Sequence, residues 1–104
     1  MQFGIDQKDI NYIIDTIETF PEVQKALIFG SRSMGNYKKG SDIDIALIGN
    51  QVNFSTIAKI KDLLQEESPM PYLFDIVDYS HCQSEDLKAH IKQYGIVLYE
   101  RSPK

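Results

Sequence analysis

The sequence predicts an α/β fold in which helices pack on a small mixed β-sheet. Apolar residues recur at helical spacing in some segments and form short continuous runs in others. The two kinds of segment alternate along the chain with short connections, which is typical of α/β folds. A length of 104 residues suits one hydrophobic core, so we expect a single domain over 1–104.

The helical segments are bounded by capping residues. Asp6 and Ser84 are N-cap types, and the apolar stripe of the third segment begins at Phe54. The residues after Ser31 are expected to form a short helix or turn that ends near Gly35. The predicted helices cover 6–20, 31–35, 54–64 and 85–93.

Four apolar runs predict the strands, at 23–29, 42–48, 71–77 and 96–99. The loop between the first two is shorter than the roughly dozen residues that a parallel crossover needs. These two strands are therefore expected to be antiparallel neighbours. That pairing brings Gly30 and Asp42 to the same end of the sheet.

Charge and cysteine content limit the classes of partner. The net charge is −4, from 15 acidic and 11 basic residues, so long-range electrostatics oppose stable binding of nucleic acid by this chain alone. One cysteine, the lack of a signal pattern and the lack of a long apolar run predict a cytoplasmic protein with no membrane segment.

Asp42 and Asp44 are the first candidates for chemistry. Side chains alternate along a strand, so both carboxylates project from one face while Ile43 and Ile45 point to the other. Two neighbouring carboxylates repel each other unless a cation lies between them. Hard oxygen ligands of this kind suit Mg²⁺, with Mn²⁺ able to substitute.

The turn before this strand is the second candidate. Gly30 allows a phosphate to approach the backbone, and Ser31 offers its hydroxyl and N–H group either to phosphate or as a helix N-cap. Arg32 is expected to bind phosphate or to pair with the protein's own acids. Ser41 is expected either to cap the loop or to contact the triphosphate.

The order of Gly30-Ser31, Gly35 and the Ser-Asp-x-Asp run at 41–44 resembles the nucleotidyltransferase superfamily that includes DNA polymerase beta. The small size and the ending at 95–100 are most similar to the minimal nucleotidyltransferases (MNT), which are often encoded beside a HEPN-domain partner as a toxin–antitoxin pair. The resemblance implies a polymerase-beta-like fold and a third carboxylate from a later strand. Asp75 matches that position, whereas the spacing of Asp78 places it on the opposite face.

The resemblance implies transfer of an NMP from ATP or another NTP to a hydroxyl, with release of pyrophosphate. Asp42, Asp44 and Asp75 would be the catalytic residues and would hold two Mg²⁺ ions. The implied acceptor is a tyrosine of a HEPN partner, which makes this chain an antitoxin. The alternative is a catalytically weak or inactive binding module that neutralises the partner by contact.

The remaining polar candidates carry weaker signals. Lys38 and Lys39 are interpreted as a solvated loop. His81, Cys82 and His90 lack the paired spacing of a zinc site and are interpreted as incidental, with His90 facing solvent. Three tyrosines are candidates for a protein-binding surface: Tyr72, Tyr79 and Tyr94.

Overall fold

The computed structural model describes residues 3–38, 40–68 and 70–102. Within them the helices are α1 (Gln7–Glu18), α2 (Ser31–Met34), α3 (Phe54–Gln65) and α4 (Glu85–Tyr94). The strands are β1 (Lys25–Phe29), β2 (Ile43–Ile48), β3 (Phe74–Asp78) and β4 (Ile96–Glu100). Lys39, interpreted from the sequence as part of a solvated loop, lies outside the described residues.

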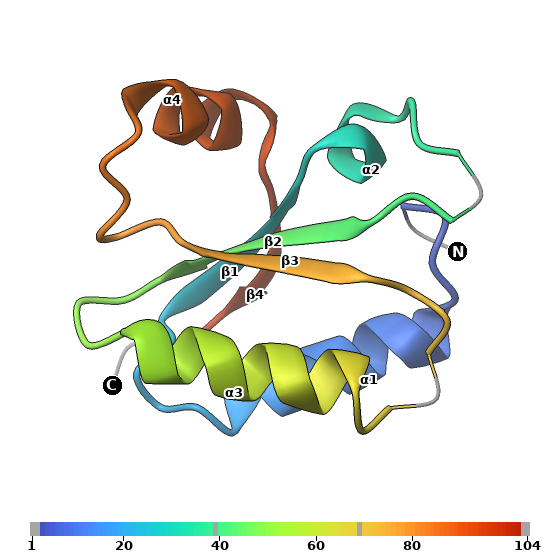
Figure 1. Cartoon of the computed structure of the whole chain (residues 1–104), viewed down its shortest axis with the longest axis horizontal. Coiled ribbons are helices and arrows are strands. Elements are labelled where there is room, and N and C mark those ends of the chain that lie inside the picture. Colours follow the sequence, from blue (N-terminus) through green and yellow to red (C-terminus); the bar gives the residue numbers. More distant parts are fainter. Residues whose placement is uncertain (1–2, 39, 69, 103–104) are drawn as a thin grey trace.

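The four strands form one mixed sheet in the order β3-β2-β1-β4 (Figure 1). Strand β1 is antiparallel to both β2 and β4, whereas β2 and β3 run parallel and are joined through α3. The mixed sheet and the antiparallel pairing of the first two strands confirm the sequence predictions.

The helices lie on both faces of the sheet. Helices α1 and α3 cover one face, while α2 and α4 lie over the other (Figure 1). The first face holds the main core, because Ile43, Ile45 and Leu47 of β2 are fully buried there. Strand alternation therefore turns Asp44 toward the face of α2 and α4.

Two sequence predictions differ from the structure. Strand β3 begins at Phe74 and not at residue 71, because its partner β2 begins only at Ile43. Ahead of β3, the Leu73 carbonyl still accepts from the Ile43 N–H at 2.9 Å, and the pairing with β2 begins there. Phe54, predicted to lie on the buried stripe of α3, is the first residue of that helix and is 85% exposed.

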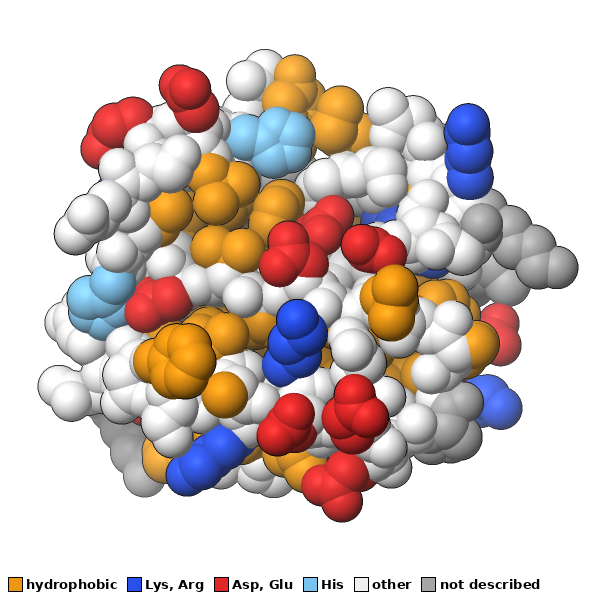
Figure 2. All heavy atoms as spheres, viewed as in Figure 1, with side chains coloured by type: hydrophobic (Ala, Val, Ile, Leu, Met, Phe, Trp, Pro, Cys, Tyr) orange, Lys and Arg blue, Asp and Glu red, His pale blue; other side chains and the backbone are white. Residues whose placement is uncertain are grey.

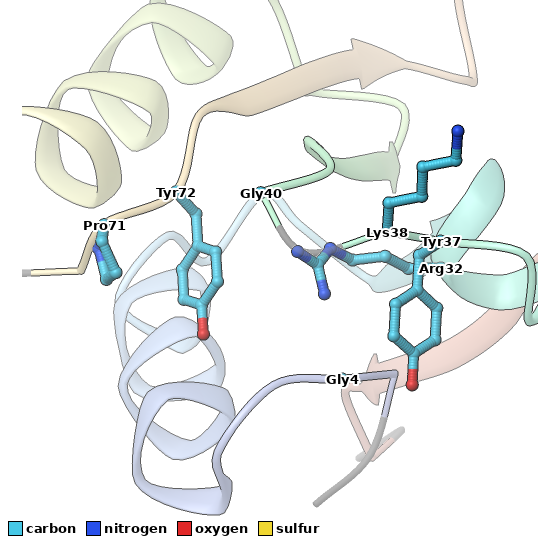
Figure 3. Close-up of a pocket in the computed structure, with 7 residues that line it drawn as sticks. All are labelled: Gly4, Arg32, Tyr37, Lys38, Gly40, Pro71 and Tyr72. Atoms are coloured by element: carbon cyan, nitrogen blue, oxygen red, sulfur yellow. The ribbon is translucent and has the colours of Figure 1, made fainter.

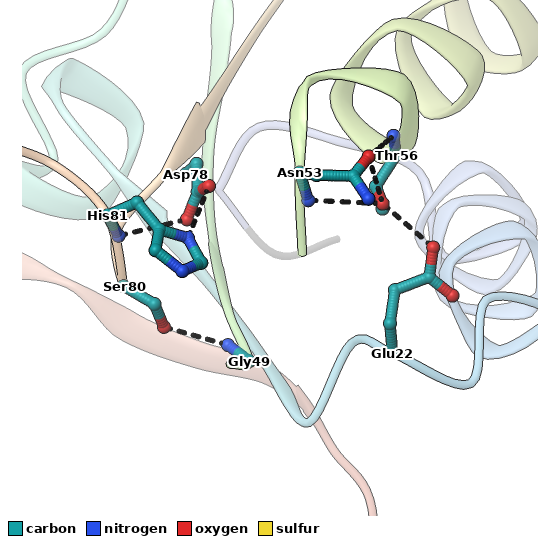
Figure 4. A network of polar contacts seen from close by, with 7 residues as sticks. All are labelled: Glu22, Gly49, Asn53, Thr56, Asp78, Ser80 and His81. Atoms are coloured by element: carbon teal, nitrogen blue, oxygen red, sulfur yellow. Dashed lines mark hydrogen bonds and ion pairs between the residues drawn. The ribbon is translucent and has the colours of Figure 1, made fainter. Parts of the chain in front are cut away.

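Polar contacts fix the ends of several elements (Figure 4). Helix α3 begins with a reciprocal cap, in which Asn53 Oδ1 accepts from the Thr56 N–H at 3.1 Å and Thr56 Oγ1 accepts from the Asn53 N–H at 3.3 Å. The same Thr56 hydroxyl donates to Glu22 Oε2 at 2.8 Å. Ser84 caps α4 by accepting from the Leu87 N–H at 3.2 Å, as its sequence position predicts. Asp6 lies at the N-cap of α1, but its side chain forms no capping hydrogen bond.

None of the helices in the described part of the chain combines the length and the apolar character required to cross a membrane.

Candidate active site

Three carboxylates lie near one another on the side of the sheet that α2 and α4 flank. Asp44 of β2 and Asp75 of β3 are direct partners in the parallel pairing, so their side chains project from the same face. Asp42 precedes β2 and lies two residues before Asp44. Figure 2 shows acidic side chains gathered near the middle of the view. The structure thus brings together the three acids that the sequence singled out.

The Asp44 carboxyl is the most perturbed of the three. Burial, followed by the charges of Asp75 and Asp42, raises its pKa from 3.8 to about 6. The positive charges of His90 and Arg32 act in the opposite direction and lower this pKa. Negative charge is therefore concentrated around Asp44, and a bound cation would relieve its repulsion.

Gly30 lies in the turn between β1 and α2 and is in direct contact with Asp44. Its backbone has φ 74° and ψ −152°, a combination that essentially only glycine adopts. A Cβ atom at this position would clash with Asp44 Oδ2. The glycine thus makes room for this carboxylate, in addition to the approach of phosphate predicted from the sequence.

Helix α2 provides the turn's hydrogen-bond donors. Gly30, and not Ser31, is the N-cap residue, so the sequence-based alternative of a Ser31 cap is wrong. Ser31 is the first residue of the helix, and the first N–H groups of a helix have no acceptor within it. Gly35 ends the helix in a left-handed conformation with φ 83°, as a helix-ending glycine is expected to do.

Arg32 is held by backbone carbonyl groups. Its side chain is buried, with 3% exposure, and its Nε and Nη2 groups donate to the Ser41 carbonyl at 3.1 and 2.7 Å. Its Nη1 donates to the Phe3 carbonyl at 2.8 Å. The expected pairing with the protein's own acids is therefore wrong, because the guanidinium joins two backbone segments that are far apart in the sequence.

The Arg32 guanidinium also lies in the wall of a cavity of about 470 Å³ (Figure 3). It is 5.4 Å from the ring centre of Tyr37 and 5.3 Å from that of Tyr72, which is within the range of cation–π attraction. The exposed Lys38 contributes to the rim. Tyr72, a candidate for a protein-binding surface, thus already contacts Arg32 within the protein.

Ser41 connects the Arg32 contacts to the acids. Its Oγ accepts from the Lys38 N–H at 2.8 Å, and its own N–H donates to the Lys38 carbonyl at 2.9 Å. Its carbonyl accepts from Arg32, and Asp42 follows it directly. Of the two roles predicted for Ser41, the structure displays the loop-capping one.

His90 is less exposed than the sequence interpretation expects. Its side chain is half-buried and its ring lies against those of Phe29 and Tyr94, and it is close enough to Asp44 to lower the pKa of that carboxyl. A signal for this was present, because His90 lies three residues after the inward-facing Leu87, on the same side of the helix. His81 is occupied elsewhere, with its Nδ1 2.8 Å from Asp78 Oδ2 (Figure 4).

A profile of the family described as "Polymerase beta, Nucleotidyltransferase" matches residues 11–104. The chain belongs to this nucleotidyltransferase family. The matched range contains the Gly30 turn, the Asp42–Asp44 pair and Asp75.

One protein with a similar sequence is "Probable protein adenylyltransferase MntA" from Haemophilus influenzae, with 34% identity over 74 residues. The match covers 70% of this chain and 63% of the relative, so the chain spans less than two thirds of the length of the curated protein it matches.

Solved structures share the nucleotidyltransferase fold. A crystal structure of a toxin–antitoxin with AMP-PNP superimposes with a TM-score of 0.72, at 22% identity, and the match covers 93% of this chain and 75% of that one. The MNT antitoxin complexed with tri-AMPylated Shewanella oneidensis HEPN toxin gives a TM-score of 0.70, at 23% identity, and the match covers 93% and 74%. These likenesses confirm the predicted fold.

The donor chemistry of this nucleotidyltransferase site fits a divalent cation. Three carboxylates supply hard oxygen ligands, and the raised pKa of Asp44 shows that their charges interact. In the described residues, however, no three acidic, histidine or cysteine side chains already form a closed metal-binding group. The acids share a face without converging on one point, which is consistent with their mutual repulsion.

Proposed function

We propose that this chain is a Mg²⁺-dependent nucleotidyltransferase that moves AMP from ATP to a hydroxyl group of a HEPN-domain partner and thereby acts as an antitoxin. The observation that carries the proposal is the placement of Asp42, Asp44 and Asp75 on one open sheet face beside the Gly30 turn. The similarity to a probable protein adenylyltransferase, and the fold shared with an MNT antitoxin complexed with an AMPylated HEPN toxin, support the choice of AMP and of partner.

In the proposed reaction the acceptor oxygen forms a bond to the α-phosphorus, the bond from that phosphorus to the β-phosphate bridging oxygen breaks, and pyrophosphate leaves. Asp42 and Asp44 would hold the divalent cation, and Asp75 would complete the site and assist removal of the acceptor proton. Bound Mg²⁺ would supply positive charge to the phosphate oxygens. The N–H groups that open α2 would bind the β- and γ-phosphates.

A labelling experiment tests the proposal. The protein is incubated with Mg²⁺, a purified HEPN-domain protein, and ATP labelled in either the α- or the γ-phosphate. We expect the α-label, but not the γ-label, on the partner, because pyrophosphate is released. Replacing both Asp42 and Asp44 with asparagine is expected to remove the labelling.

An exposed acid on another element provides the control. Asp62→Asn changes the net charge by one unit on α3, which covers the opposite face of the sheet, and is expected to leave labelling unchanged. If the wild-type protein labels the partner with none of the four NTPs yet blocks its activity, neutralisation by contact replaces the proposed transfer.

A further inference from the structure

Helix α4 carries a histidine toward the acid face. His90 is half-buried, and its ring lies edge-on to Phe29, with 6.2 Å between centroids and 78° between planes. Its other ring neighbour is Tyr94, with 5.1 Å between centroids. These two contacts hold the imidazole over β1, on the side of the sheet where α4 and α2 lie (Figure 1).

The contact with Phe29 places His90 beside Asp44. Phe29 and Asp44 are direct partners in the antiparallel pairing of β1 and β2. Residues opposite each other in such a pair project from the same face, with Cβ atoms about 5 Å apart. His90 lowers the pKa of the Asp44 carboxyl, which agrees with this placement.

An anionic substrate at this face needs hydrogen-bond donors, which ionised carboxylates cannot supply. Of the two cationic groups that act on Asp44, Arg32 is buried and donates to the carbonyls of Phe3 and Ser41. The ring nitrogens of His90 form no hydrogen bond within the described residues, although the ring is partly exposed. Of these two side chains, His90 is therefore the one whose donor has no partner within the described residues.

We propose that His90 binds the triphosphate of the nucleotide, donating a hydrogen bond from a ring nitrogen to a phosphate oxygen. A neutral imidazole carries one N–H donor, so the contact does not require protonation. The ring contacts with Phe29 and Tyr94 position it. The inference rests on the proposed nucleotide-binding function and assigns one of its ligands to α4.

A matched pair of variants separates the donor from the packing. His90→Gln keeps an N–H donor, whereas His90→Met has similar length and no donor. Affinity for ATP with Mg²⁺ is measured for both, together with displacement of labelled ATP by inorganic tripolyphosphate with Mg²⁺, which lacks base and sugar. His81→Met is the control, because His81 contacts Asp78 after β3.

We expect His90→Met to weaken binding of both ATP and tripolyphosphate by about tenfold or more, the loss typical of one hydrogen bond to a charged group. The affinities of His90→Gln should stay closer to those of the wild type, and the affinities of His81→Met should equal the wild-type values. Melting temperatures without nucleotide should be similar for the two His90 variants, because they fill similar volumes.

Other outcomes would overturn the inference. Unchanged affinities in His90→Met would exclude the contact, and a loss for ATP alone would assign His90 to the base or sugar. Equal losses in both variants would show that only ring packing matters. A wild-type protein that fails to bind ATP with Mg²⁺ would overturn the proposed function as well, which distinguishes the two failures.

Discussion

The Asp44 carboxylate fills the space that a Cβ atom at position 30 would occupy. Gly30 reaches this close approach with a φ of 74°, so its conformation and its lack of a side chain are both required. The turn that would bind phosphates and the acid that would bind the cation are thus in direct contact. A change in one is expected to displace the other.

Gly30→Ala tests this contact. The added methyl group should strain the backbone and push Asp44 aside, lowering the free energy of unfolding by about 1–3 kcal/mol and weakening Mg²⁺-dependent ATP binding. Gly35→Ala is a matched control, because Gly35 also has a positive φ, of 83°, but nothing lies within 4 Å of its added Cβ. The free energy of unfolding of Gly35→Ala should fall by about 1 kcal/mol, with little effect on ATP affinity. Equal loss of ATP binding in both variants would contradict the Gly30–Asp44 coupling.

Asp44→Asn is expected to stabilise the metal-free protein at neutral pH. The pKa of Asp44 is about 6 in the folded protein and is 3.8 for an unperturbed aspartate, as in the unfolded chain. The folded wild type therefore loses stability as the pH rises from about 3.8 through 6. An uncharged asparagine avoids the loss. Because the side chain is partly exposed and screened by solvent, we expect a gain of about 1 kcal/mol at pH 7.5.

Urea unfolding in the presence of a chelator, at pH 3.5 and pH 7.5, measures this difference. The gain should disappear at pH 3.5, where Asp44 is mostly protonated in both folded and unfolded states. A variant that is clearly less stable than the wild type at pH 7.5 would show that the carboxylate has a structural role.

Asp75→Asn should separate nucleotide binding from transfer. If Asp75 completes the site and assists removal of the acceptor proton, labelling of the partner should slow by at least about a hundredfold. ATP affinity should change by less than about tenfold, since Asp42 and Asp44 remain. Asp78→Asn is the comparison on the same strand, because Asp78 contacts His81 away from the acids. Similar rates of labelling in the two variants would remove Asp75 from the proposed mechanism.

Arg32→Lys should destabilise the protein even without nucleotide. A lysine cannot bridge the carbonyls of Phe3 and Ser41 as the guanidinium does, so we expect a loss of about 2 kcal/mol in the free energy of unfolding. Chemical denaturation of the nucleotide-free protein measures it. ATP affinity should also fall, because Ser41 immediately precedes Asp42.

Arg101 provides the control for this variant. It likewise donates to backbone carbonyls, those of Glu18, Phe20 and Val23, at 3.2, 3.0 and 3.1 Å. Arg101→Lys should lose stability while keeping ATP affinity. An Arg32→Lys protein of wild-type stability but weak ATP binding would instead support the phosphate contact predicted from the sequence.

Much of the candidate site follows from local pattern. The alternation of strand side chains places Asp42 and Asp44 on one face, and the loop of 35–41 is short enough to require the antiparallel pairing of β1 and β2. The position of Asp75 beside Asp44 needed one more fact, the register of the parallel pair. That register depends on how α3 and its connecting loops pack between the two strands. No periodic pattern in the sequence specifies this packing.

The sequence by itself determined the order of helices and strands, the mixed sheet and the shared face of Asp42 and Asp44, because these depend on side-chain periodicity and loop length over a few residues. The tertiary structure alone decided the burial of Arg32, the fit of Gly30 against Asp44 and the approach of His90 to the acids. Each of these joins segments that are distant in the sequence, so its geometry is set by how α2 and α4 pack on the completed sheet.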